Sequence, residues 1–181
     1  MNKEQIQVAK KTLKILSEKT WNKVEFSDVL VRIKKFPTNI KNKHDLLKNI
    51  NRYIDYLLKI DTKSIETSTK KDMLFEVIMA RFDILEKNRK SILNIYKSVK
   101  SKPHKSLLLI PSFLDSMILT ANLAKINTNG LKGSVKIKGI FLIYISTFFV
   151  WKDDNTHAIE KTMTSLDNYI DRAESLIKNI L

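Results

Sequence analysis

The feature that most limits the fold of this chain is its shortage of residues that make turns. Its 181 residues include three glycines and three prolines, whereas a sheet-rich fold needs a turn after every short strand. Long stretches instead repeat apolar residues at spacings of three and four, the period of one face of an α-helix. The sequence therefore predicts an all-α fold.

This periodicity and its interruptions predict about nine helices. They span residues 4–19, 27–33, 37–41, 43–60, 72–87, 91–99, 105–126, 135–151 and 156–181. Ser27 is the expected N-cap of the second helix, and Pro111 is expected to kink the seventh. The segment 127–133 (NTNGLKG) contains two of the three glycines and is expected to end that helix.

A polar segment at residues 62–69 (TKSIETST) predicts a linker between two modules, residues 1–60 and 70–181. The net charge of the chain is +14. Residues 1–60 hold 14 basic and 6 acidic residues, a net charge of +8, so the smaller module carries more than half of the excess. Such a basic module indicates DNA or another anionic partner.

Several classes of protein are disfavoured. The chain has no cysteine, which excludes disulfides and thiolate sites and, with a polar N-terminus, favours the cytoplasm. The apolar run 137–151 is shorter than the roughly 18 residues of a membrane span and predicts a buried helix. His44, His104 and His157 lie in separate segments, and no nucleophile or phosphate-loop motif occurs, so we expect no metal, no cofactor and no enzyme.

Three short helices before a long fourth, followed by five more, resemble the layout of TetR-family regulators. Residues 13–30 (LKILSEKTWNKVEFSDVL) resemble the opening pattern of that family, and residues 42–47 (NKHDLL) resemble the start of its fourth helix. The resemblance implies a TetR-like fold with a helix-turn-helix-like N-terminal module and with Lys43 contacting a phosphate. It also implies a homodimer in which the last two helices of each chain meet.

The C-terminal module resembles one branch of that family, common in alphaproteobacteria and similar to the lipid-binding accessory proteins of ubiquinone biosynthesis. The matching segments are residues 72–92, 129–133, 150–154 and 162–167, together with Met117. The segment from Val29 to Lys43 departs from the family, because it is short and lacks the turn glycine and the aromatic residue of the recognition helix. This departure disfavours sequence-specific reading of DNA, which needs a helix projecting into the major groove.

Seven polar residues are candidates for DNA contact, the lysines for phosphates and the other two for base edges. They are Lys34, Lys35, Thr38, Asn39, Lys41, Lys43 and Lys48. The alternative is a solvated surface in a chain that is rich in lysine throughout.

Eight aromatic and methionine residues of the bundle are candidates for lining a site for an apolar or isoprenoid ligand. They are Phe75, Met79, Phe82, Phe113, Met117, Phe141, Tyr144 and Phe148. The last helix carries a heptad seam, which predicts a dimer interface. Its residues are Ile159, Met163, Leu166, Ile170 and Ile177. The alternatives are an ordinary core for the first set and packing within one chain for the second.

Two functions follow. The first is a homodimeric TetR-like transcriptional regulator, which binds DNA through its N-terminal module and a small apolar ligand in its bundle. The second is a lipid-binding accessory protein of the ubiquinone-biosynthesis type, which has the TetR fold without sequence-specific DNA binding. The shortened segment favours the second function, and the concentrated positive charge favours the first.

Overall fold

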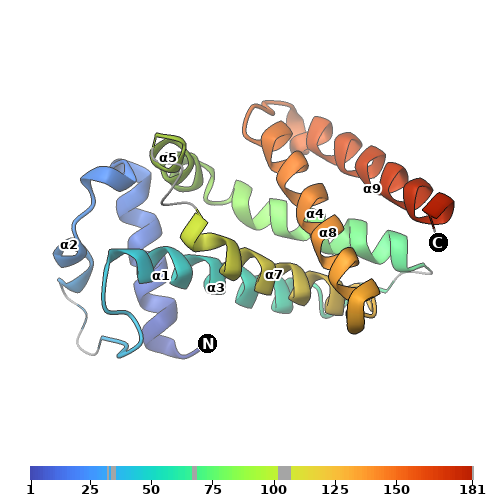
Figure 1. Ribbon diagram of the computed structural model, residues 1–181. Coiled ribbons are helices and arrows are strands. Elements are labelled where there is room, and N and C mark those ends of the chain that lie inside the picture. Colours follow the sequence, from blue (N-terminus) through green and yellow to red (C-terminus); the bar gives the residue numbers. More distant parts are fainter. Residues whose placement is uncertain (32, 34–35, 67–68, 102–106, 181) are drawn as a thin grey trace. The chain divides into compact units, whose positions relative to one another are not determined.

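The computed structural model describes residues 1–31, 33, 36–66, 69–101 and 107–180, with side chains up to residue 175. This described part consists of eight α-helices and three short 3-10 helices, without a strand (Figure 1). The predicted all-α class is confirmed. The chain divides into two compact units, residues 1–60 with 83–116 and residues 61–82 with 117–181.

Unit 1 begins with α1 (Lys3–Glu18), which a capping box starts. The Asn2 side chain accepts a hydrogen bond from the Gln5 amide at 2.9 Å, and the Gln5 side chain accepts one from the Asn2 amide at 3.2 Å. These bonds occupy donors that the first helical turn leaves without partners. The buried face of α1 includes Ala9, Leu13 and Leu16, at the spacings of four and three that the sequence predicts.

The next elements of unit 1 are η1 (Trp21–Lys23), α2 (Phe26–Leu30) and α3 (Lys43–Asp61). The prediction for α2 was wrong in its cap, because Glu25 and Asp28 form the capping box and Ser27 lies inside the helix. Asn42 accepts hydrogen bonds from the amides of His44 and Asp45 at 2.9 and 3.1 Å, which fixes the start of α3 close to the predicted residue.

The other helices of unit 1 are the end of α4 (Lys70–Glu86), α5 (Arg89–Lys100), η2 (Leu107–Leu109) and the first half of α7 (Ile110–Leu123). Hydrogen bonds attach α5 to α1. Ser91 Oγ donates to the Leu13 carbonyl at 2.7 Å, and Asn94 Nδ2 donates to the Leu16 carbonyl at 2.8 Å. These contacts place residues 83–116 in the same compact unit as the N-terminal residues. The division into functional modules of residues 1–60 and 70–181 stays a prediction.

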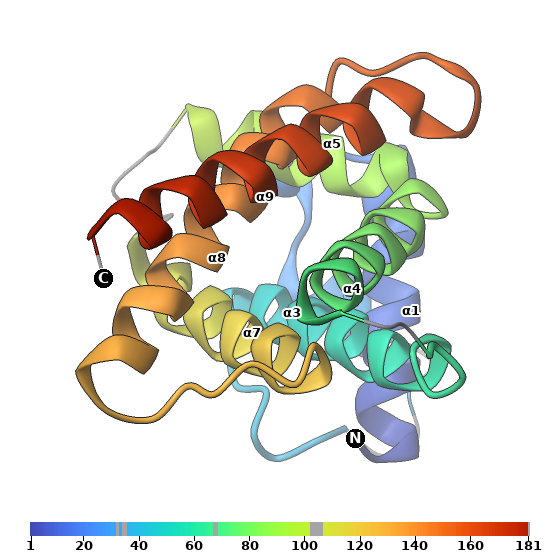
Figure 2. The same cartoon turned by 90° about the vertical axis from the view of Figure 1, so that its right-hand side faces the viewer.

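Unit 2 contains the first part of α4, the end of α7, α8 (Gly130–Trp151), η3 (His157–Ile159) and α9 (Glu160–Ile180). α9 packs against the C-terminal part of α8 in both views of the chain (Figures 1 and 2). Lys71 on α4 forms an ion pair with Asp171 on α9. The core of this unit includes the fully buried Phe82, Met117 and Leu166.

Two local predictions around α7 and α8 were wrong. Pro111 lies in the first turn of α7, where a missing amide costs nothing, and therefore starts the helix instead of kinking it. Gly130 begins α8 with a φ of 66°, and Gly133 lies inside that helix. The glycines of segment 127–133 therefore belong to a helix start, whereas α7 ends at Leu123, with Lys125 at a φ of 56°.

Candidate nucleic-acid and ligand sites

The segment that would form the recognition helix is a turn. The Ile40 amide donates to the Pro37 carbonyl at 3.2 Å, and Pro37 and Ile40 are buried. Among the residues described between Leu30 and Lys43 there is no helix, so the predicted helix over 37–41 was wrong. The physical reason is the short length of the segment. Pro37 and Ile40 are both buried, so only the two residues between them reach solvent, and a recognition helix would need more residues than that.

The tip of this turn carries Thr38 and Asn39, both exposed. The Asn39 side chain accepts a hydrogen bond from Gln5 Nε2 of α1 at 3.2 Å. Thr38 and Asn39 therefore lie on a loop, which Asn39 attaches to the first turn of α1. They do not lie on a helix that could enter the major groove of DNA.

Lys43 is held against its own unit. Its Nζ lies 4.9 Å from the centre of the Trp21 ring and 3.5 Å from the Asn22 carbonyl oxygen. A cation over the face of tryptophan is attracted by the π-electrons of the ring. The aromatic residue of η1 thus has a partner that the sequence reasoning missed.

The remaining candidate lysines differ in placement. Lys41 is exposed and Lys48 is half-buried, while Lys34 and Lys35 lie outside the described residues. The Lys41 amide donates to Asp45 Oδ2 at 3.0 Å, so a carboxylate lies beside this part of the basic surface.

Three of the eight candidate ligand residues, Phe82, Tyr144 and Phe148, belong to one aromatic cluster of unit 2. The ring centres of Phe82 and Tyr144 are 5.5 Å apart, and those of Phe148 and Trp151 are 5.4 Å apart. Phe82 lies 6.2 Å from Trp151 and connects the two pairs. Met117 is fully buried in the same unit.

The sequence reasoning missed two members of this cluster. Trp151 ends α8, as the predicted helix over 135–151 implies, and it is fully buried, but it was not among the candidate ligand residues. Arg81 is 1% exposed, and its guanidinium carbon lies 5.4 Å from the centre of the Tyr144 ring. The available signal was that Trp151 lies three residues after the candidate Phe148 and that Arg81 directly precedes the candidate Phe82.

The other four candidate ligand residues are half-buried. Phe75 and Met79 lie on α4 and Phe141 on α8, all within unit 2. Phe113 belongs to unit 1, on the first part of α7.

The heptad seam of α9 faces mainly into its own unit. Ile159, Leu166 and Ile170 are buried, whereas Met163 is 43% exposed. The side chain of Ile177 lies outside the described residues. The prediction that this seam forms a dimer interface therefore stays a prediction, with Met163 as the described member that reaches solvent.

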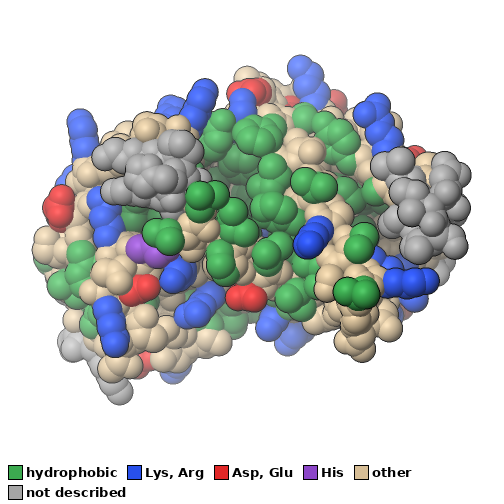
Figure 3. Space-filling view, in the orientation of Figure 1, with side chains coloured by type: hydrophobic (Ala, Val, Ile, Leu, Met, Phe, Trp, Pro, Cys, Tyr) green, Lys and Arg blue, Asp and Glu red, His purple; other side chains and the backbone are tan. Residues whose placement is uncertain are grey.

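The exposed apolar stripe lies on α8 instead. Leu131, Val135, Leu142 and Phe149 are 49–89% exposed. With Lys138 and the half-buried Ile145 they advance by 4, 3, 4, 3 and 4 residues, the spacing of a heptad seam. Hydrophobic side chains gather on the face shown in Figure 3, in the region where α8 runs. We call these six residues the α8 stripe.

The helix expected over 137–151 is present as part of α8, but the expectation that it is a buried helix was wrong. α8 has 22 residues and a window of mean hydropathy 1.5, of which 28% is buried. By length and composition alone it could cross a membrane, a property that core helices of soluble proteins share. Lys132, Lys136 and Lys138 lie in its first half.

Asp154 organises the connection from α8 to α9. Its two carboxylate oxygens accept four hydrogen bonds of 2.5–2.9 Å, from the amide and hydroxyl of Thr156 and of Thr162. Burial by itself raises the pKa of this carboxyl, but the hydrogen bonds from Thr156 and Thr162 outweigh it and hold the pKa well below its ordinary value. Asp154 is thus a structural carboxylate.

No protein-family model and no curated protein matches this chain. Among solved structures, the TetR transcriptional regulator from Nitrosomonas europaea ATCC 19718 is similar over 96% of this chain and 99% of its own, with a TM-score of 0.74 and 15% identity. The chain has a TetR-like fold. At this identity the likeness concerns the fold, and the function has to be argued from the residues.

Proposed function

We propose that this protein is a homodimeric TetR-fold accessory protein, which binds an apolar ligand in its C-terminal bundle and does not read DNA sequence. The observation that carries the proposal is the turn at Thr38 and Asn39, which stands where a recognition helix would lie. Reading base edges in the major groove needs side chains presented by an element that enters the groove.

The bundle supplies the chemistry for an apolar ligand. Phe75, Met79 and Phe141 are half-buried in the unit that contains the buried Phe82 and Met117. Methionine and aromatic side chains adapt to flexible apolar molecules and provide most of the surface of typical ligand sites. The resemblance of this module to lipid-binding accessory proteins of ubiquinone biosynthesis supports an isoprenoid chain as the ligand class.

The proposed dimer uses the α8 stripe as its centre. Exposed apolar residues at heptad spacing pack well against a second copy of the same helix. Met163 of α9 is exposed as well.

A second candidate function is sequence-specific regulation of transcription. The likeness of the fold to the regulator from Nitrosomonas europaea supports it, as does the net charge of +8 on residues 1–60.

The lipid part of the proposal is tested by extracting the purified protein with organic solvent and identifying co-purified lipids by mass spectrometry. We expect a stoichiometric isoprenoid or other lipid. We expect F75A/M79A to retain much less of it while keeping its helical circular dichroism. The matched control is L107A/L108A, which shortens two side chains that are 61% exposed in unit 1. A lipid-free protein, or equal loss in both variants, would refute a bundle site.

The DNA part is tested by gel shift with the upstream region of its own gene and with a shuffled duplex of equal length. We expect the two affinities to agree within about tenfold and to fall steeply with salt, as for purely electrostatic binding. Substituting T38A/N39A should leave both affinities unchanged. A preference of about 10³-fold or more for the upstream region is the range of specific binding and would favour the regulator.

A further inference from the structure

The segment that leads into α7 exposes an apolar patch on unit 1. Leu107 and Leu108 are each 61% exposed and Ile110 is 37% exposed, whereas Leu109 is 7% exposed. Pro111 is exposed as well. The buried Leu109 anchors η2 in the core of the unit, so its neighbours are held toward solvent. We call Leu107, Leu108, Ile110 and Pro111 the η2 patch.

The helix that precedes this patch, α5, is cationic on its outer face. A buried hydroxyl on its inner face, that of Ser91, bonds α5 to α1 within the same unit. The outer face carries Lys90, Lys97 and Lys100, which are exposed. Their spacings of seven and three residues place them on one side of the helix. The sequence has no acidic residue from 87 to 114, so no carboxylate of this stretch reduces its positive charge.

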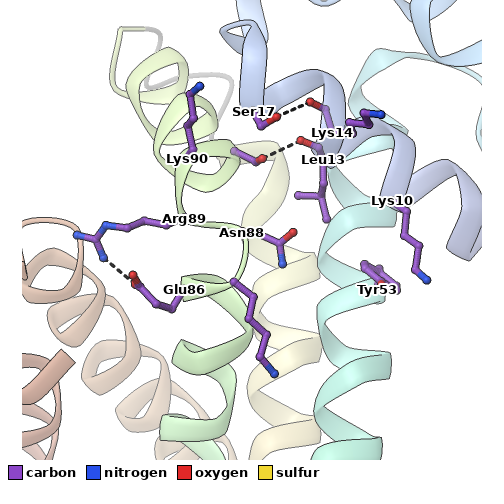
Figure 4. A pocket seen from close by; sticks show the side chains of 11 residues that line it. Lys10, Leu13, Lys14, Ser17, Tyr53, Glu86, Asn88, Arg89 and Lys90 are labelled. Carbon is purple, nitrogen blue, oxygen red and sulfur yellow. Dashed lines mark hydrogen bonds and ion pairs between the residues drawn. The ribbon is translucent and has the colours of Figure 1, made fainter. Parts of the chain in front are cut away.

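The cations of this part of unit 1 do not converge on one point. Figure 4 shows Lys90 extending from α5 away from Lys10 and Lys14, which extend from α1 on the other side of the view. A single small anion could not contact all of them, whereas a surface with many negative charges could. Anionic lipid membranes attract clustered lysines through their headgroups and accept apolar side chains at the boundary with the acyl chains.

The combination of leucines and lysines disfavours two other partners. The phosphates of DNA would attract the lysines, but they offer no apolar contact to Leu107 and Leu108. A second copy that used the same face in a two-fold interface would bring the lysines of α5 close to their own counterparts, and like charges repel.

We propose that unit 1 docks on an anionic lipid surface, with the η2 patch entering the boundary between headgroups and acyl chains and the outer lysines of α5 contacting the headgroups. Reversible attachment to a membrane commonly combines an apolar contact with a basic patch, because either one alone binds weakly. This docking does not depend on the dimer or on the apolar ligand site proposed for unit 2.

The test is flotation of the full-length protein with vesicles of phosphatidylcholine, either pure or mixed with phosphatidylglycerol at a molar ratio of about 7 to 3. We expect binding to the mixed vesicles that weakens as salt is added, and much weaker binding to the pure ones. L107A/L108A and K97Q/K100Q should each lower the partition coefficient on mixed vesicles about tenfold or more, while keeping the helical circular dichroism.

The matched controls are L30A/V31A, which shortens two other exposed apolar side chains of unit 1, and K132Q/K161Q, which removes two exposed lysines of unit 2. Both should bind the vesicles as the unmodified protein does. Equal loss in a variant and its control would overturn the proposal.

Two further outcomes would also overturn it. Vesicle binding that requires Leu142 and not Leu107 would assign the lipid contact to the α8 stripe. A protein that ignores the vesicles, while K97Q/K100Q loses affinity for a DNA duplex, would assign the lysines to nucleic acid. L107A/L108A should keep the lipid that co-purifies in the bundle, so failure of the docking and failure of the ligand site are observed separately.

Discussion

At the scale of single residues, Gly133 is the position with the least room for a side chain. A Cβ atom there would lie 2.0 Å from the carbonyl carbon and oxygen of Thr128, whereas a Cβ at Gly139 would meet nothing within 4 Å. We expect Gly133→Ala to lower the free energy of unfolding by about 1–3 kcal/mol through overpacking. Gly139→Ala should raise it by about 0.5–1 kcal/mol, because alanine loses less backbone entropy in a helix. Urea denaturation of both variants measures the difference, and changes of the same sign would contradict the placement of α8.

Asp154 makes the stability of the α8–α9 connection depend on pH. Its pKa is lowered in the folded protein, so its stabilising contribution is fully present above the unfolded pKa of about 4 and is lost as the pH falls through the folded pKa. We expect Asp154→Asn to cost about 1–3 kcal/mol at pH 7, since an amide nitrogen would face donors of Thr156 or Thr162. The difference in the free energy of unfolding between the wild-type protein and Asp154→Asn should become smaller below about pH 4. Thermal unfolding of both proteins between pH 7 and pH 3 measures this difference, and Asp153→Asn, at an exposed position, is the control. A difference that stays constant with pH would refute the structural role of the Asp154 carboxylate.

At the scale of secondary-structure elements, the attachment of α5 to α1 defines unit 1. The Ser91 hydroxyl is buried and its bond to the Leu13 carbonyl is 2.7 Å long. We expect Ser91→Ala to destabilise the protein by about 1 kcal/mol, the usual net value of such a bond. Hydrogen exchange should quicken at the amides of both α1 and α5. Ser134→Ala, at an exposed position on α8, should change neither, and faster exchange confined to α5 would contradict the proposed attachment.

The long helices could be predicted from sequence because their signal is local. The spacing of apolar residues fixed α3 within one residue of its observed bounds, Lys43–Asp61. The prediction of a helix over residues 37–41 failed. Helix propensity permits one turn there, but the burial of Pro37 and Ile40 leaves too few residues to form it. Short elements are decided by tertiary contacts, which periodicity does not report.

The faces of α8 and α9 show the second limit of sequence reasoning. Heptad spacing occurs on both helices. It indicates that a helix packs against another helix, but it does not identify whether that partner belongs to the same chain or to a second copy. In the structure the α9 seam packs largely within unit 2, through Leu166 and Ile170, and the α8 stripe reaches solvent at Leu142. Arg81 was missed for a related reason, because a charged residue between apolar neighbours has no sequence signal for burial beneath Tyr144.

At the scale of the whole molecule, the net charge and the α8 stripe have opposite effects on the proposed dimer. Each chain carries a net charge of +14, so two copies repel at low ionic strength, where charges are poorly screened. Burial of apolar residues such as Leu142 and Phe149 drives association and is not weakened by simple salts at moderate concentration. The proposed dimer should therefore tighten as salt is added, whereas binding to DNA should weaken.

This opposition gives the sharpest test of assembly. We expect analytical ultracentrifugation to show a monomer–dimer equilibrium that shifts toward the dimer between about 50 and 500 mM sodium chloride, as the Debye length falls from roughly 14 to 4 Å. Leu142→Glu should weaken the dimer at every salt concentration, because it replaces an apolar contact of the stripe with a carboxylate that loses its hydration against a second copy. The control Leu108→Glu places the same charge at a residue that is 61% exposed in unit 1 and should still dimerise. A wild-type monomer throughout, with α8 binding lipid vesicles instead, would show that the stripe faces a membrane surface and would overturn the dimer.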